Sequence, residues 1–148
     1  MLAKGDKAPS FDLVNERGVS QSLEELLQEG ALILYFYPAD FTLVCTKEAC
    51  GIRDIYADIS SVGMRVIGVS PQSAESHKRF KDRFDLPFPL IHDEAKKLIN
   101  AYGVNGLLGI GVRRVTFLID SDGRIGQRVV SDLFAGSHIE FIRKIIST

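Results

Sequence analysis

Residues 31–37 read ALILYFY, an unbroken apolar run with no polar position on either alternating face. Successive side chains of a strand point to opposite faces of a sheet, so a strand of this composition must be covered on both sides. The run is far too short to cross a bilayer as a helix, which takes about 20 apolar residues. We therefore expect a central, fully buried strand here.

Strand-like and helix-like patterns alternate along the rest of the chain. Further strands are predicted at residues 11–14, 64–70, 115–120 and 125–130, with a tight turn at 122–123 between the last two. Helices are predicted to begin at Ser22, Thr42, Ser73, Asp93 or Glu94, and Ser137. This alternation indicates one α/β domain over residues 1–148. Its central, mainly parallel sheet should be flanked by helices, with an N-terminal extension and an antiparallel edge.

Two of these helix starts carry a capping box, in which a serine is followed three residues later by a glutamate. The pairs are Ser22 with Glu25 and Ser137 with Glu140. Predicted helix ends lie at Gly30, about Ser60 and near Gly103.

Charge and composition exclude several classes of protein. The 148 residues carry a net charge of −1 without a block of like charges, which argues against nucleic-acid binding. The N-terminus lacks the apolar segment of a signal peptide, and no run is long enough to span a membrane. The expected location is the cytoplasm, where disulfides are usually transient and catalytic.

The chain has two cysteines, Cys45 and Cys50, and four interpretations of the pair are open. They are a zinc half-site, a structural disulfide, two buried thiols and a redox pair. A structural zinc site needs four ligands at suitable spacing, and His77, His92 and His138 are scattered along the chain. We therefore expect no metal.

The position of Cys45 favours a reactive thiol over an inert one. If Thr42 is the N-cap, Cys45 is the third helical residue, where unpaired N–H groups and the helix dipole stabilise a thiolate. An ordinary thiol with a pKa near 8.5 is about 3% ionised at pH 7, and a pKa near 6 would need about 3.4 kcal/mol. A helix end supplies at most ~2 kcal/mol, so a nearby cation is required as well.

The spacing of the two cysteines argues against a static bridge. Five residues along an α-helix separate the Cα atoms by about 8.6 Å, and a disulfide spans at most about 7 Å. A redox pair fits if the helix from Thr42 to Cys50 can unwind. Two small buried thiols without chemistry are the other interpretation.

The segment Pro38-Ala-Asp-Phe-Thr42-Leu-Val-Cys45 resembles the P-x-x-x-[TS]-x-x-C signature of peroxiredoxins. The continuation Cys45-Thr-Lys-Glu-Ala-Cys50 is similar to the bacterioferritin comigratory protein, or peroxiredoxin Q, subfamily. The resemblance includes GDKAPSFDL, MRVIGVSPQSAESHKRF and RRVTFLIDSDGRI, and so covers nearly the whole chain. It implies a thioredoxin-like fold.

The resemblance also implies a role for each residue of the motif. Cys45 would be the nucleophile that a peroxide oxidises to a sulfenic acid. Thr42 would hydrogen-bond the peroxide through its hydroxyl, and Pro38 would shield the site from water. The backbone N–H groups of Val44 and Cys45 would also face the peroxide.

Arg114 matches the active-site arginine of the family and would supply the cation. Arg113 competes for this role, but alternation along a strand should send the two side chains to opposite faces. Glu48 matches a position that orients the arginine; the alternative for it is an exposed helix residue.

Cys50 would resolve the sulfenic acid by forming an intramolecular disulfide with Cys45. Thioredoxin or a similar dithiol would reduce this disulfide. The substrate would be hydrogen peroxide or an alkyl hydroperoxide, and no metal, haem, flavin or other cofactor is implied. A monomer is expected because both cysteines lie on one chain; a dimer is the alternative.

One departure from the subfamily is the pair Leu43 and Val44, where Pro-Gly is usual. This difference leaves the preferred peroxide open.

Two other functions compete with the peroxidase. A thioredoxin-type oxidoreductase would need C-x-x-C and a cis-proline where Val115 stands. A redox-sensing or chaperone-like protein would use the two cysteines as a switch.

Overall fold

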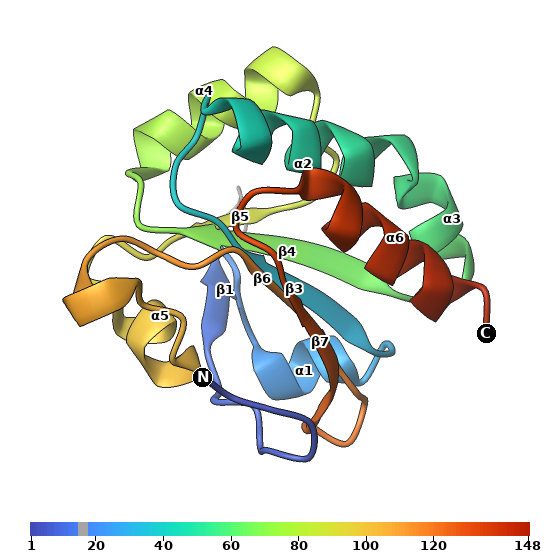
Figure 1. Cartoon of the computed structure of the whole chain (residues 1–148). Helices are drawn as coiled ribbons and strands as arrows, with labels where there is room; N and C mark the ends of the chain where they lie inside the picture. Colours follow the sequence, from blue (N-terminus) through green and yellow to red (C-terminus); the bar gives the residue numbers. More distant parts are fainter. Residues whose placement is uncertain (15–17) are drawn as a thin grey trace.

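The computed structural model describes residues 1–14 and 18–148, in which a five-stranded sheet is covered by helices on both faces (Figure 1). Across the sheet the strands run in the order β5 (Leu90–His92), β4 (Arg65–Ser70), β3 (Leu32–Phe36), β6 (Val115–Ile119), β7 (Ile125–Val130). The central position of β3 confirms the prediction made from its apolar run.

The sheet is mixed. β3 pairs with β4, and β4 with β5, in parallel, whereas β3–β6 and β6–β7 are antiparallel. Four of the five strands therefore share one direction and β6 opposes them. The predicted turn and antiparallel edge are confirmed: Gly123 N donates to Asp120 O (2.9 Å), and Gly123 has a φ of +85°.

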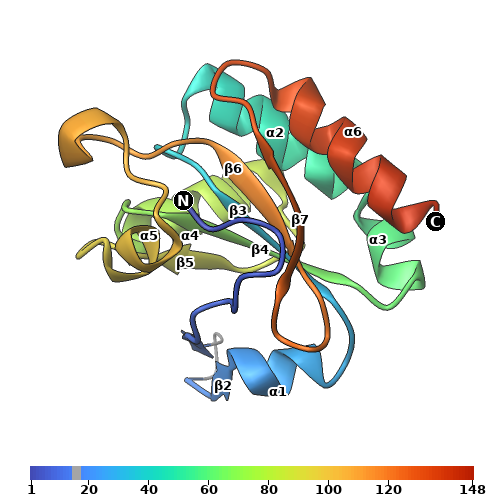
Figure 2. The ribbon, with the colours of Figure 1, turned by 60° about the horizontal axis from the view of Figure 1, so that its bottom comes forward.

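Six α-helices and one 3₁₀ helix are present in the described residues. They are α1 (Leu23–Leu27), α2 (Leu43–Asp54), α3 (Tyr56–Ser61), α4 (Ala74–Phe84), α5 (Lys97–Tyr102), α6 (Ala135–Ile146) and η1 (Leu107–Gly109). α2, α3, α4 and α6 cover one face of the sheet, and α1 and α5 lie on the other (Figures 1 and 2). No helix in the described residues has the length and apolarity needed to cross a membrane.

Alternate residues of β3 fill two separate cores. Leu34 and Phe36 point towards α1 and α5, whereas Ile33 and Tyr35 point towards α2, α4 and α6. All four side chains are at most 1% exposed. The uniform apolarity of this strand is thus explained by helical layers on both faces.

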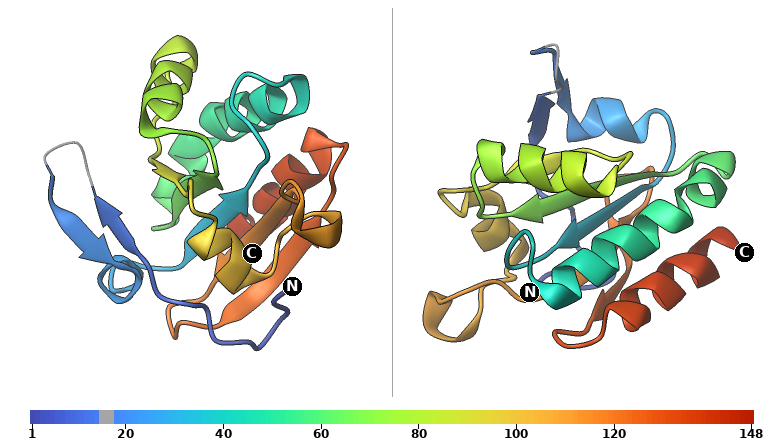
Figure 3. Two further views of the ribbon diagram at one scale, coloured as in Figure 1. Left: turned by 90° about the vertical axis from the view of Figure 1, so that its left-hand side faces the viewer. Right: turned by 90° about the horizontal axis from the view of Figure 1, so that it is seen from above.

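The N-terminal extension forms a small two-stranded antiparallel sheet, β1 (Asp12–Val14) with β2 (Ser20–Ser22), followed by α1 (Figure 3). The first capping box is confirmed: Glu25 N donates to Ser22 Oγ (3.2 Å), and Ser22 N donates to Glu25 Oε1 (3.5 Å). The predicted end at Gly30 is late, because Gln28 is already the C-cap.

The second predicted capping box is wrong. α6 begins at Ala135 after Phe134, so Ser137 and Glu140 are both inside the helix. The ring of His138 is fully buried at this end of α6 and hydrogen-bonds to Thr116. Such tertiary contacts outweigh a local cap, which is worth about 1 kcal/mol.

One predicted helix is divided in the structure, and two short strands were not predicted. The helix predicted to run from Thr42 to about Ser60 is interrupted at Ile55, which separates α2 from α3. The bend allows Ile55 and Ile59 to be buried. The three-residue strands β2 and β5 were not predicted, because such short segments have no measurable periodicity.

The helix predicted to begin at Asp93 or Glu94 begins later, at Lys97. Asp93 still satisfies its free N–H groups from outside the helix: Leu98 N donates to Asp93 Oδ1 (3.1 Å) and Ile99 N to Oδ2 (2.7 Å). Of the two predicted start residues, Asp93 therefore caps the helix, but from four residues before its first residue instead of at its start.

Replacing Asp93 with alanine should lower the free energy of unfolding by about 1–2 kcal/mol, because two buried N–H groups lose their acceptor. Urea denaturation measures the change. Glu94→Ala is the matched control, since this neighbouring side chain is 58% exposed and should change stability by less than about 0.5 kcal/mol. Equal losses in both variants would contradict the capping role.

Candidate active site

Cys45 lies at the buried N-terminal end of α2. The chain leaves β3, passes through a short loop and enters α2 after Thr42, whose φ of −76° and ψ of 154° make it the N-cap (Figure 3). Cys45 is therefore the third helical residue, as predicted, and is 1% exposed. The first helical hydrogen bond joins Thr46 N to Thr42 O (2.8 Å), so the N–H groups of Val44 and Cys45 point out of the helix end.

The guanidinium of Arg114 provides a cation beside this thiol. Its Nη2 donates to Cys45 Sγ at 3.2 Å, and its side chain is 4% exposed. Strand pairing explains the contact: Phe36 of β3 is paired with Val115 of β6, so the residue before β6 lies beside the exit from β3. Burial alone would lower the pKa of Arg114, but the negative charges of Glu48 and Cys45 outweigh it and raise the pKa.

Arg113 points elsewhere. It forms an exposed, bidentate ion pair with Asp132, with Nη2 at 2.8 Å and Nε at 3.0 Å from Oδ2. Asp132 Oδ1 also accepts from the backbone N of Arg114 (3.0 Å), and its carbonyl accepts from Arg114 Nε (3.3 Å). Asp132, which the sequence did not indicate, thus holds both arginines in their opposite orientations.

Glu48 lies on the same face of α2, one turn after Cys45. Its Oε1 accepts from Arg114 Nη1 at 2.8 Å, and its side chain is 0% exposed, so the alternative of a solvated helix residue is wrong. Burial raises the pKa of Glu48 to about 7, although the charge and hydrogen bond of Arg114 oppose the rise. One guanidinium therefore contacts both the carboxylate and the thiol.

His138 completes the buried network behind Glu48. Its Nε2 donates to Ser131 O (2.9 Å), and its Nδ1 lies 2.7 Å from Thr116 Oγ1 and 3.4 Å from Glu48 Oε2. Burial lowers the pKa of His138, so the ring is neutral and Nδ1 accepts from the threonine hydroxyl.

Sequence reasoning did not select His138 as a site residue. The available signal was its spacing: His138, Ile142 and Ile145 lie at i, i+4 and i+7 on the buried face of α6. A histidine in an otherwise apolar stripe requires buried hydrogen-bond partners.

Thr42 and Pro38 belong to the loop that joins β3 to α2 and so precede Cys45 closely in the chain. The Thr42 hydroxyl donates to Ala39 O (3.0 Å) instead of capping α2, which leaves its lone pairs free to accept a hydrogen bond from a ligand. Pro38 is half-buried and its carbonyl lies 3.4 Å from Ser70 Oγ. Leu43, one of the two residues that depart from the subfamily, is 72% exposed and so needs no space in the core.

Cys50 is a half-buried free thiol further along α2, and Cys45 is also free. Both belong to one uninterrupted helix, the arrangement for which helix geometry separates the two Cα atoms beyond disulfide reach. Ala49 and Ile52, on either side of Cys50, are fully buried. Bond formation between the thiols therefore requires residues of this helix to leave the core.

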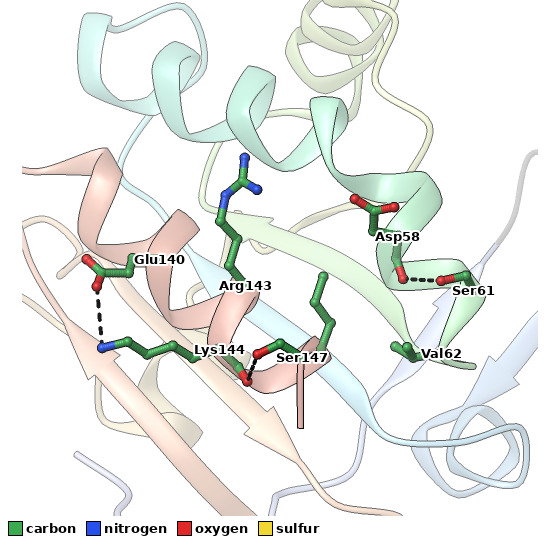
Figure 4. Close-up of a pocket in the computed structure, with 8 residues that line it drawn as sticks. Asp58, Ser61, Val62, Glu140, Arg143, Lys144 and Ser147 are labelled. Atoms are coloured by element: carbon green, nitrogen blue, oxygen red, sulfur yellow. Dashed lines mark hydrogen bonds and ion pairs between the residues drawn. The ribbon is translucent and has the colours of Figure 1, made fainter.

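A surface pocket lies at the other end of α6 and shares no residue with this site (Figure 4). It is lined by Asp58, Ser61, Val62, Glu140, Arg143, Lys144, Ile146 and Ser147. The Lys144–Glu140 pair within it (3.3 Å) is mostly exposed, as expected for an ordinary surface contact.

Comparison with known proteins identifies the family. The model of the AhpC/TSA family matches residues 4–128, most of the chain. The chain belongs to this family. Peroxiredoxin Bcp of Bacillus subtilis is 39% identical over 127 residues, covering 82% of this chain and 80% of that protein. Chloroplastic peroxiredoxin Q of Sedum lineare is 36% identical over 149 residues, covering 99% of this chain and 79% of that protein.

The solved structures agree with the sequence relatives. The crystal structure of peroxidoxin BcpB from Mycobacterium tuberculosis superposes with a TM-score of 0.89 at 30% identity, covering 99% of this chain and 97% of that one. The resemblance to Bcp/Q peroxiredoxins and the thioredoxin-like fold are thus confirmed. Membership of this family implies a thiol peroxidase.

Replacing Arg114 with leucine in this peroxiredoxin should slow the alkylation of Cys45 at neutral pH by at least about threefold, because the charge-assisted hydrogen bond to its sulfur is lost. The alkylation rate in the Cys50→Ser background measures the change. Arg113→Leu is the neighbouring control and should react at the unmodified rate. An Arg114→Leu variant whose Cys45 is alkylated as fast as in wild type would refute the electrostatic role.

The raised pKa of Glu48 predicts that unwinding of α2 depends on pH. Between its ordinary value of 4.5 and about 7, buried Glu48 binds more protons than it would in an unwound segment. The free energy of unwinding should therefore fall as pH rises through this window and level off above pH 7. Amide hydrogen exchange, corrected for intrinsic rates, should show protection of residues 46–50 falling at least about tenfold from pH 5 to 7.5. Glu48→Gln should abolish this slope; a slope that persists in the variant would assign it to another group.

Proposed function

We propose that the chain reduces hydrogen peroxide or alkyl hydroperoxides, with Cys45 as the peroxidatic residue, Cys50 as the resolving residue and thioredoxin or a similar dithiol as the reductant. The observation that carries the proposal is the buried guanidinium of Arg114, 3.2 Å from a thiol at a helix N-terminus. The helix end and the cation are the two contributions that an ionised Cys45 needs.

In the first step, the Cys45 thiolate attacks one oxygen of the peroxide. An S–O bond forms as the O–O bond breaks, giving a sulfenic acid, and the leaving oxygen takes a proton to become water or an alcohol. Arg114 and the N–H groups of Val44 and Cys45 are the donors for the oxygen on which negative charge develops, and the Thr42 hydroxyl, which donates to Ala39 O, accepts a hydrogen bond from the peroxide. Pro38 limits the access of water from the loop side.

In the second step, the Cys50 thiol attacks the sulfenic sulfur. An S–S bond forms and water leaves. A dithiol reductant then attacks the disulfide, forms a mixed disulfide and releases both thiols, supplying the two electrons that the peroxide consumed. Because both cysteines lie on α2, the whole cycle fits within a monomer. Such a reductant is typical of the cytoplasm, where we place the protein.

The buried contact between Glu48 and Arg114 supports an order for the two steps of the cycle. Glu48 lies between Cys45 and Cys50 in the sequence and contacts Arg114. When the helix unwinds, Glu48 leaves Arg114, and the cation loses both of its anionic neighbours. Peroxide reduction and disulfide formation therefore require different conformations of α2, one folded and one unwound.

Peroxide-dependent NADPH oxidation, coupled through thioredoxin and its reductase, tests the cycle. Wild type should turn over continuously, Cys45→Ser should be inactive, and Cys50→Ser should not be recycled by thioredoxin. Wild-type turnover in Cys45→Ser would exclude the mechanism. A single turnover by wild type, without recycling, would favour the redox-switch alternative.

Thiol counting provides a second measurement, since the chain has only two cysteines. One equivalent of peroxide should remove both thiols of wild type, one thiol of Cys50→Ser as a trappable sulfenic acid, and none of Cys45→Ser. A structure of the oxidised protein should show residues 43–50 no longer helical. A Cys45–Cys50 disulfide within an intact α2 would contradict the unwinding step.

A further inference from the structure

A second buried cluster of ionisable groups lies beside the loop that precedes α2. At its centre is Asp40, two residues before Thr42, with a side chain that is 0% exposed. Asp40 Oδ1 accepts from the Tyr37 hydroxyl (2.7 Å), and Oδ2 accepts from the Ser76 hydroxyl (2.7 Å) and lies 2.7 Å from His77 Nδ1. Two of these partners belong to α4, so Asp40 ties the loop to that helix.

The hydrogen-bond partners of His77 define its protons. Its side chain is 5% exposed, with Nδ1 against the Asp40 carboxylate and Nε2 3.0 Å from Ile91 O. A carbonyl only accepts hydrogen bonds, and so does an ionised carboxylate. A neutral ring has one N–H group, so its other nitrogen would direct a lone pair at one of these acceptors. Only the imidazolium, with an N–H group on each nitrogen, can donate to both acceptors.

Asp40 is suited to be the anion of this pair. Burial alone would raise its pKa, but hydrogen bonds from His77, Tyr37 and Ser76 together outweigh burial and lower the pKa. The carboxylate therefore stays ionised at neutral pH. A buried charge of this kind is stable only with a paired and fully hydrogen-bonded partner, which the imidazolium provides.

The next residue strengthens the attachment to α4. Phe41 adopts a left-handed backbone conformation, with a φ of +64°, which is unfavourable for a bulky residue unless its surroundings hold it. Its ring packs against Phe80 (5.2 Å between centroids) and Phe84 (6.1 Å), both on α4. Residues 40 and 41 are thus held by α4.

The first turns of α2, which follow, are held by a different helix, whereas its last turn reaches α4, where Arg53 Nη1 donates to Phe84 O (2.7 Å). α2 packs against α6, and its buried polar contacts run through Glu48 to Arg114. In the proposed cycle, α2 must unwind from Thr42 onwards, whereas none of the contacts of Asp40 and Phe41 described above involves α2. These two sets of tertiary contacts change over between Phe41 and Thr42, which the local hydrogen bond from Thr42 Oγ1 to Ala39 O spans.

We propose that His77 is a positioning residue, which, as an imidazolium paired with Asp40, holds residues 40 and 41 on α4 while α2 unwinds and refolds. The inference rests on the proposed function. The fixed loop returns Pro38 and the start of α2 to the same place after each cycle. The chain then bends between Phe41 and Thr42, and the peroxide-binding end of the site refolds directly into its original position.

Nitrogen NMR of the histidine side chains tests the pairing in wild-type protein. The His77 ring, assigned with a His77→Gln variant, should carry protons on both nitrogens at pH 7. It should keep them after the Cys45–Cys50 disulfide is formed with peroxide or diamide. A neutral His77 ring in the reduced protein, or loss of the Asp40 contact upon oxidation, would overturn the proposal.

Kinetics of the separate steps test the positioning role. Asp40→Asn and His77→Gln should each slow the oxidation of Cys45 by peroxide at least about tenfold, since small misplacements of reacting groups are costly. The double variant should be no slower than the worse single variant, because the two residues act as one pair. His92→Gln, which changes an exposed ring that lies 3.5 Å from the carboxylate of Glu94, should react as wild type.

The rate of disulfide formation from the sulfenic acid distinguishes positioning from a purely structural role, because general structural damage would slow this step too. It should change by less than about threefold in Asp40→Asn and His77→Gln, because α2 carries both cysteines. Equal slowing of both steps, or additive losses in the double variant, would overturn the inference. If wild-type Cys45 does not react with peroxide at all, the proposed function fails, while the NMR result still decides whether the pair exists.

Discussion

One buried guanidinium contacts two acidic groups, and the site depends on this arrangement. Arg114 and Glu48 are 4% and 0% exposed, so both charges have lost most of their hydration. Such a pair contributes little to stability by itself, because desolvation cancels much of the attraction. Its effect is to direct a positive charge at Cys45 Sγ, 3.2 Å from Nη2. The sheet register and Asp132 hold this one group in place.

The same burial gives α2 two opposing requirements. In the proposed cycle, its first turns are folded while the N–H groups and the thiol face the peroxide, and they unwind so that Cys50 can reach Cys45. A carboxyl group with a pKa of about 7 in the middle of this segment weakens the folded form at neutral pH. The loop before α2, held by α4, and the helix after it, packed on α6, are therefore stabilised by separate contacts.

Much of the fold could be predicted from local pattern. The buried strand at residues 31–37, the Ser22 capping box and the turn at Gly123 were found because periodicity and cap chemistry act within a few residues. The second capping box failed because the register of α6 is set by the buried His138 ring. Residues such as Asp132 and His77 could not be selected, since their roles depend on partners 18 and 37 positions away.

The sequence by itself determined the central strand, the α/β class, the helix position of Cys45 and the impossibility of a disulfide within an intact helix, because each follows from short-range geometry. Only the tertiary structure decided that Arg114 and not Arg113 faces the thiol, that Glu48 is buried, and that His138 and His77 each complete a buried network. These outcomes depend on strand pairing and helix packing, which bring residues distant in sequence within hydrogen-bonding distance. Desolvation, which sets the pKa of Glu48, exists only after that packing is complete.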